Sequence, residues 1–112
     1  AIAKEKLSRN KSINLEGPSF DCKKATTRNE KAICGDNDLS NLDGLLGKAY
    51  SKARKKTYSD NKNEQKDIVS TIKAQQKNWV LTIQKKCNGD VACLKKVIID
   101  RTKVLESILS SH

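Results

Sequence analysis

The stretch that decides the fold runs from residue 87 to residue 108 and reads CNGDVACLKKVIIDRTKVLESI. One face of it advances by three or four residues at a time: Val91, Leu94, Ile98, Arg101, Leu105 and Ile108. That period is typical of a helix with one buried face. Asn88-Gly89-Asp90 is a turn sequence, and Asp90 can cap the helix that follows it. The stretch predicts an amphipathic helix entered through a tight turn, with Cys87 and Cys93 on the two sides of that turn.

The same period predicts two more long helices upstream. One runs roughly from Glu64 to Lys86, and its face consists of Ile68, Ile72, Gln76, Trp79 and Ile83. The other runs from about Leu39 to Tyr58, with Asp38 or Ser40 as its N-cap, and its face consists of Leu39, Leu42, Leu46, Ala49 and Ala53. The polar residues Ser59–Asn63 form the turn between these two helices.

A shorter helix precedes these three. Thr27 and Glu30 have the spacing of a capping box, in which hydroxyl and carboxylate accept bonds from otherwise unpaired backbone amides. Gly35 ends this helix. Gly44 and Gly47 fall inside the next helix, where each costs about 1 kcal/mol relative to alanine. Their presence predicts close approach by a neighbouring helix.

The predicted fold is therefore all-α, a small disulfide-stapled bundle of about four helices, one short and three long. Its 112 residues fit a single domain. We expect residues 1–17 to be a flexible or weakly helical lead-in and residues 18–112 to be one helical domain. No run approaches the roughly 18 apolar residues of a membrane span. No signal peptide is visible, so we expect a mature form whose targeting segment has been removed.

Four cysteines allow three pairings. The helix prediction selects Cys22–Cys34 with Cys87–Cys93, because each bond closes a local turn. Closing loops of about 13 and 7 residues contributes roughly 2–3 kcal/mol each in the chain-entropy model. Disulfides indicate an oxidising compartment, so we expect a periplasmic or secreted protein. A metal site is disfavoured because the sequence has no Cys-x2-Cys unit and its one histidine is the terminal His112.

Arg101 is the exception on the last helix's apolar face. A guanidinium there needs a carboxylate partner, since an unpaired buried charge is very costly. Asp43 and Glu30 are the candidates, and Gln76 can extend the same network. We interpret the arrangement as a structural ion pair that fixes helix register.

The net charge is +10, and its excess is concentrated. Residues 48–66 carry seven basic and two acidic side chains, whereas residues 20–47 carry four and five. Such a segment is a solvated helix end or the electrostatic footprint of an acidic partner. The candidate partner-binding residues in it are Arg54, Lys55, Lys56, Tyr58 and Lys62.

Enzymatic chemistry has little support. The terminal histidine disfavours a nucleophile–histidine pair, and disulfide formation would remove the thiols as nucleophiles. No phosphate-binding glycine loop or metal-ligand cluster is present, so no cofactor and no metal are expected. Specific nucleic-acid binding is disfavoured because Trp79 lies on a core stripe, away from the basic run.

Several motifs together resemble the LprI-like lysozyme-inhibitor family over residues 18–109. They are Pro18-Ser19-Phe20-Asp21-Cys22-x-x-Ala25, Glu30-x-Ala32-Ile33-Cys34, Leu39-Ser40-x-Leu42-Asp43-x-x-Leu46-x-x-Ala49-Tyr50, Gln76-x-x-Trp79, Cys87, Cys93-Leu94 and Arg101-x-x-x-Leu105. The resemblance implies a helical, exported protein with two disulfides. Ile83 and Ile98 depart from the family pattern, which often has Arg and Tyr at these two positions.

The resemblance implies an exported protein that inhibits a peptidoglycan-degrading enzyme by occluding its active site. The expected partner is a protein, a lysozyme-like cell-wall hydrolase or a cell-wall-targeting toxin. A basic animal lysozyme would be repelled by a chain of net charge +10, so an acidic bacterial hydrolase or toxin fits the charge better. The alternative is a non-catalytic envelope module that binds an anionic glycan, a lipid or a protein partner.

Overall fold

The computed structural model describes residues 17–110 and is helical, with no strand in that range. Its elements are the 3-10 helix η1 (Cys22–Lys24) and the α-helices α2 (Arg28–Gly35), α3 (Asn37–Lys55), α4 (Lys62–Cys87) and α5 (Val91–Ser110). Apart from Gly17, the predicted lead-in of residues 1–17 lies outside the described residues. One short and three long α-helices confirm the predicted fold class.

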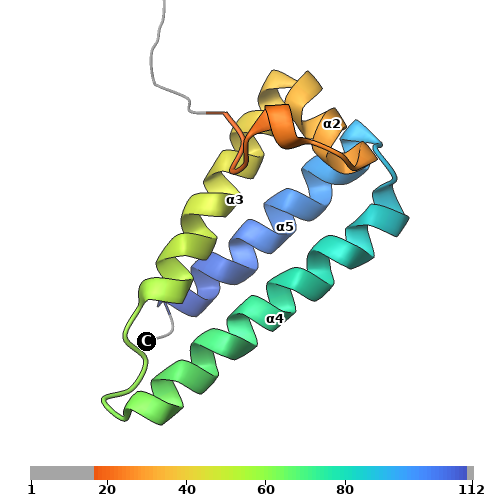
Figure 1. Ribbon diagram of the computed structural model, residues 1–112. Helices are drawn as coiled ribbons and strands as arrows, with labels where there is room; N and C mark the ends of the chain where they lie inside the picture. Colours follow the sequence, from red (N-terminus) through yellow and green to blue (C-terminus); the bar gives the residue numbers. More distant parts are fainter. Residues whose placement is uncertain (1–16, 111–112) are drawn as a thin grey trace, which may run out of the picture.

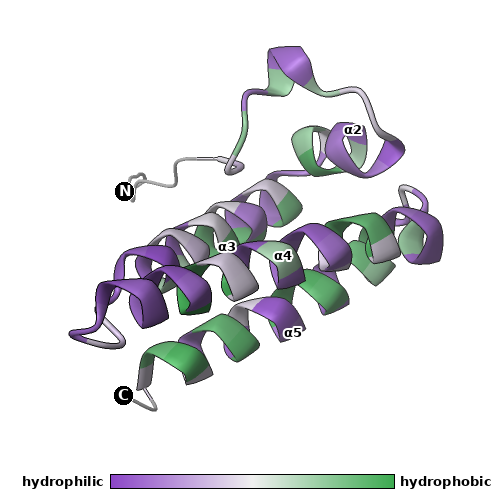
Figure 2. Cartoon of the chain, turned by 60° about the horizontal axis from the view of Figure 1, so that its bottom comes forward, coloured by the Kyte–Doolittle hydropathy of each residue, from purple (hydrophilic) through white to green (hydrophobic). Residues whose placement is uncertain are grey.

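The three long helices lie side by side, and α2 crosses one end of them (Figure 1). α3 and α5 run in the same direction, and α4 runs opposite to both. Figure 2 shows long hydrophobic stretches along α5, whereas the turn between α3 and α4 is mostly hydrophilic. None of the described helices is long and apolar enough to cross a lipid bilayer.

The core lies mainly between α3 and α5. Its largest fully buried side chains are Leu39, Leu94, Ile98 and Leu105. Ala49 and Ala53, one turn apart on α3, are also buried, and their small side chains let a neighbouring helix approach closely. α4 adds Ile72 and Ile83 to the same cluster.

Two disulfides staple one end of this bundle, the end that α2 crosses (Figure 1). Cys22–Cys34 ties η1 back to the end of α2, with a Cα–Cα distance of 5.9 Å. Cys87–Cys93 spans the turn from α4 to α5, with a Cα–Cα distance of 5.3 Å. These are the two pairs that the helix prediction selected. In the turn, Asn88 has φ of +48°, a left-handed backbone that ends α4.

Asn29 is a buried residue of α2 that the sequence patterns did not single out. Its side-chain amide donates to the carbonyl oxygen of Ile83 at 3.0 Å, and its side-chain oxygen accepts from the amide of Gly89 at 2.7 Å. Both groups of one buried side chain are therefore paired. The contacts hold α2 against the end of α4 and the turn that follows.

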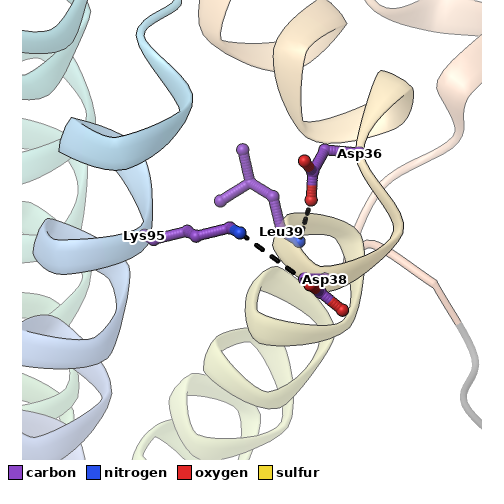
Figure 3. A network of polar contacts seen from close by, with 4 residues as sticks. All are labelled: Asp36, Asp38, Leu39 and Lys95. Carbon is purple, nitrogen blue, oxygen red and sulfur yellow. Dashed lines mark hydrogen bonds and ion pairs between the residues drawn. The ribbon is translucent and has the colours of Figure 1, made fainter.

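The N-cap predicted for α3 is wrong by a few residues. Asp36 caps the helix, because its carboxylate accepts from the amide of Leu39 at 2.9 Å. The two predicted caps have other contacts: the Ser40 hydroxyl donates to the carbonyl oxygen of Ile33, and exposed Asp38 forms an ion pair with Lys95 of α5 at 3.8 Å (Figure 3). An exposed pair of this kind contributes about 0–1 kcal/mol.

The turn between α3 and α4 is longer at its start and shorter at its end than predicted. α3 ends at Lys55, three residues before Tyr58, and α4 begins at Lys62 because Asn61 caps it. The Gln65 side chain organises this turn. It accepts from the amide of Tyr58 at 2.6 Å and donates to the carbonyl oxygen of Lys56 at 2.7 Å. These side-chain bonds replace the backbone bonds that would have continued α3.

The α3 glycines have a different neighbour from the one predicted. An added Cβ at Gly44 would collide with the carbonyl oxygen of Gly17, and one at Gly47 would collide with the Cβ of Ser19. The close approach is therefore by the extended chain that enters the domain, and not by a helix. Asp43, directly before Gly44, holds that chain through two bonds from Ser19, one from its amide at 2.8 Å and one from its hydroxyl at 2.7 Å.

We predict that Gly44→Ala lowers the free energy of unfolding by about 1–3 kcal/mol, because the new methyl group overlaps a backbone carbonyl. Helix propensity alone predicts the opposite sign, a gain of about 1 kcal/mol. Urea denaturation measures the difference. Gly35→Ala is the control, since a Cβ there has open space and should change stability by less than about 0.5 kcal/mol. A Gly44→Ala variant as stable as the parent protein would contradict the packing described here.

Candidate functional site

A cleft of about 450 Å³ lies between α3 and α4. α3 and α4 form its two walls, Ile98 of α5 contributes to its floor, and α2 together with Ser19 and Phe20 closes one end. The wall residues are Asp43, Leu46, Gly47, Tyr50 and Arg54 on α3, and Gln76, Trp79, Val80, Ile83 and Gln84 on α4. Its size is typical of pockets that hold small ligands.

Aromatic side chains give this cleft apolar surfaces. Phe20, Tyr50 and Trp79 line it, and each is half-buried against the core. Trp79 therefore lies at the edge of the core and also in the wall of a cleft, which the stripe on α4 could not distinguish. Val80, next to it, is 39% exposed and lines the cleft as well.

Two guanidinium groups lie around Tyr50. Arg54 of α3 stacks over the Tyr50 ring, with its Cζ 4.8 Å from the ring centroid. Arg101 of α5 donates from Nε to the side-chain oxygen of Gln76 at 2.8 Å. Burial lowers the pKa of Arg101 below its ordinary value, and the nearby Tyr50 partly offsets that shift. Arg54 Nε and Arg101 Nη2 are both buried and have no hydrogen-bond partner among the described residues.

The ion pair predicted for Arg101 is wrong. Within residues 17–110, neither Asp43 nor Glu30 bonds to Arg101, because each carboxylate has backbone partners of its own. Asp43 accepts from Ser19, and Glu30 accepts from the amides of Thr26 and Thr27, both at 3.0 Å. The predicted capping box is thus present and has removed one of the two candidates. Gln76, predicted as part of the network, supplies the bond instead.

The five candidate partner-binding residues do not form one surface. Arg54 faces the cleft. Lys56 is half-buried and donates to the carbonyl oxygen of Leu109, at the end of α5. Tyr58 is half-buried, donates its hydroxyl to the carbonyl oxygen of Ala53 at 2.6 Å, and has its pKa raised by burial. Lys55 and Lys62 remain exposed, on the last turn of α3 and the first turn of α4.

A model of the lysozyme inhibitor LprI family matches residues 22–108. The chain belongs to the LprI family. The match covers most of the chain and confirms the family that the motifs indicated. The comparisons with curated proteins and with solved structures gave no match. Within residues 17–110, no three His, Cys, Asp or Glu side chains gather where they could hold a metal ion.

The structure also locates the two departures from the LprI-like pattern. Ile83 and Ile98 are both buried, at 6% and 1% exposure, and both line the cleft. Ile83 and Ile98 therefore belong to both the core and the cleft, so a substitution at either position changes the cleft surface as well as the packing. The sequence pointed to Gln76 and Arg101 as one network, but it gave no sign that Gln76 and Trp79 line a cleft.

We predict that Glu30 makes the stability of this LprI-family domain pH-dependent. Hydrogen bonds from the amides of Thr27 and Thr26 lower the pKa of Glu30 below its ordinary 4.5, so its contribution is present above that pH and is lost as pH falls through the lower folded-state pKa. The free energy of unfolding of Glu30→Gln should lie below that of the parent protein at pH 7, and the gap should close below pH 4.5. Urea denaturation across this range measures the gap.

Glu106→Gln is the matched control, because Glu106 is exposed on α5 and caps no helix. Its difference from the parent protein should stay small at every pH. A Glu30→Gln gap that persisted unchanged at pH 3 would show that the carboxylate charge does not stabilise the cap.

We predict that Arg101→Met keeps or raises the free energy of unfolding, because methionine fills the apolar stripe without a buried charge that lacks a carboxylate. Leu105→Ala, one turn further along the same stripe, should cost about 2–5 kcal/mol. Thermal and urea denaturation of both variants measure the contrast. A loss of 2 kcal/mol or more in Arg101→Met would mean that the bond to Gln76 is required for the fold.

Proposed function

We propose that this chain is an exported protein that inhibits a peptidoglycan-degrading enzyme, a lysozyme-like hydrolase or a cell-wall-targeting toxin, by occluding its active site. The observation that carries the proposal is the match to the lysozyme inhibitor LprI family over residues 22–108. Inhibition by occlusion needs a stable surface more than it needs catalytic groups. We propose accordingly that the chain is not an enzyme.

The scaffold supports this role. Two disulfides close one end of a thin-cored bundle, at α2 and at the α4–α5 turn, and such bonds persist in the periplasm or outside the cell. A bundle held in this way can present one surface with little loss of conformational entropy on binding. A periplasmic or secreted location follows as part of the proposal.

The end of the bundle at the α3–α4 turn is the proposed inhibitory surface. It contains three of the basic residues predicted to bind the partner, Lys55, Lys56 and Lys62, of which Lys55 and Lys62 are exposed, whereas Arg54 faces the cleft. Lys56 and Tyr58 support the turn from within, through their bonds to Leu109 and Ala53. Glycosidases act with a pair of carboxyl groups that must differ in protonation. An ammonium group placed between them would favour ionisation of both and disable acid catalysis.

The charge of the chain favours an acidic target. At net charge +10, long-range repulsion would slow association with a basic lysozyme, whereas an acidic hydrolase or toxin would be attracted. The association rate with the proposed target should therefore fall as salt concentration rises.

The test is an inhibition assay of the oxidised protein against a panel of acidic and basic peptidoglycan hydrolases. We expect inhibition of an acidic member and a loss of about tenfold in inhibition constant, corresponding to about 1.4 kcal/mol, for the double variant Lys55→Gln/Lys62→Gln. Lys31→Gln/Lys103→Gln removes the same charge from exposed sites on α2 and α5 and should change inhibition by much less.

Absence of inhibition across the whole panel would overturn the proposal. If that result came with salt-sensitive binding to anionic vesicles or anionic glycans, the alternative of an envelope-binding module would replace it.

A further inference from the structure

We propose that the α3–α4 cleft binds a small carboxylate ligand with an apolar body about the size of one ring. This site is separate from the proposed inhibitory surface at the α3–α4 turn, and the proposal does not depend on inhibition. Shape, unpaired cationic groups and the position of the acidic groups each support it.

The shape suits a compact ligand. The cleft measures about 450 Å³, within the roughly 300–1,000 Å³ of small-ligand sites. Ser19, Phe20 and residues of α2 line one end of it, where α2 crosses the bundle (Figure 1), which favours a compact ligand over a long polymer. Tyr50 of the α3 wall and Trp79 of the α4 wall both line it, so each wall offers aromatic surface to an apolar ring.

The unpaired guanidinium groups favour an anionic ligand. Arg54 lines the cleft and makes no hydrogen bond within residues 17–110, although its Nε is buried. Arg101 Nη2 is also buried without a partner. Buried donors are nearly always paired in native proteins, so the unpaired guanidinium of Arg54 in the cleft wall indicates a missing acceptor there. Arg101 does not line the cleft, and its unpaired Nη2 adds positive charge behind the wall. A carboxylate matches the planar fork of a guanidinium with two parallel bonds.

The roles of the two arginines differ. Arg54 is at the cleft surface and would bond the carboxylate directly. Arg101 lies behind Gln76, whose side-chain oxygen accepts from Arg101 Nε. Arg101 would therefore act as a positioning residue: it fixes the Gln76 amide and adds positive charge beneath the wall.

The acidic side chains that line the cleft lie away from Arg54 and do not neutralise its charge. Asp43 is eleven residues before Arg54 on α3, which is about 16 Å along the helix axis. Its carboxylate is bonded to Ser19, and the Glu30 carboxylate is bonded within the capping box of α2. The cleft is thus cationic at the Tyr50–Arg54 end and acidic at the end that α2 closes.

The α4 wall extends the cationic surface. Val80 and Gln84 line the cleft, and Lys73 and Lys77 share their helix face because the four residues are spaced by four, three and four. The two acidic residues of α4 are Glu64 and Asp67. Since successive helix residues are about 100° apart, both lie on other faces of α4 than these lysines. The lysines would raise the local concentration of an anionic ligand near the cleft.

Trp79 makes the proposal directly testable, because it is the one tryptophan of the chain and lines this cleft. The probes are cyclohexanecarboxylate and its neutral, nearly isosteric amide, cyclohexanecarboxamide, neither of which absorbs where tryptophan does. We expect a saturable change in Trp79 fluorescence with the carboxylate and at least tenfold weaker binding of the carboxamide. No saturable change, or equal binding of both probes, would overturn the proposal.

Variants that remove the same charge at different positions distinguish specific binding in the cleft from attraction by the overall positive charge of the protein. Arg54→Gln should weaken binding of the carboxylate at least tenfold, whereas Lys52→Gln, exposed on the opposite side of α3, should change it less than twofold. Arg101→Met should also weaken binding while its thermal stability is kept, which distinguishes a positioning role from a purely structural one. Equal weakening of carboxylate binding by Arg54→Gln and Lys52→Gln would show that binding reflects only non-specific electrostatic attraction, and the proposal would be wrong.

The source of the carboxylate is tested with a short peptide that has blocked ends and a central glutamate. It should bind more weakly than cyclohexanecarboxylate, because the closed end of the cleft limits the size of the ligand. Binding of the peptide tenfold tighter than that of the small acid would assign the cleft to an acidic side chain of a protein partner, and the small-ligand proposal would be wrong.

Discussion

The close packing of α3 on α5 is the contact on which the rest of the structure depends. Alanines at 49 and 53 of α3 and the fully buried Leu94, Ile98 and Leu105 of α5 form the centre of the core. With α3 and α5 in contact, α4 covers the apolar surface of both helices that is still exposed. Its side facing α3 includes Gln76 and Trp79, which are only half-buried. The opening left between α3 and α4 is the cleft. The cleft thus arises because small side chains bring α3 close to α5, whereas α4 packs less closely against α3.

Polar anchors hold the end of that cleft closed. Asn29 pairs both groups of its amide with the end of α4 and the following turn, and Asp43 accepts both donors of Ser19. Each anchor joins segments at least 24 residues apart, where hydrophobic contact alone would leave buried polar groups unpaired. The Cys22–Cys34 disulfide then restrains the entering chain from the other side. Staples and anchors together fix a segment that has little apolar surface of its own.

Arg101 shows which contacts a local sequence pattern can predict and which depend on the tertiary structure. Its place on an apolar stripe made a buried guanidinium predictable, and Gln76 was readable as a neighbour on α4. The carboxylate partner was not predictable, because Asp43 and Glu30 satisfy backbone donors that become close only in the folded chain. A guanidinium left without a carboxylate is a structural cost, and such costs are often retained where a ligand supplies the missing partner. In this way one incorrect prediction leads to the cationic end of the cleft.

The sequence by itself determined the all-α class, the three long helices, the capping box of α2, the local cysteine pairs and membership of the LprI family. The helices, the capping box and the cysteine pairs follow from spacings of three or four residues, from short-range capping bonds and from turn residues, all of which act over short distances along the chain. Family membership follows from motifs distributed over most of the sequence. Only the tertiary structure decided where α3 begins and ends, what lies against Gly44 and Gly47, and that Arg54, Tyr50, Gln76 and Arg101 meet. Apart from the start of α3, where a local cap at Asp36 prevailed over Asp38 and Ser40, those features depend on contacts between segments far apart in the sequence. The distances between such segments are set by packing of the whole bundle, which no local pattern records.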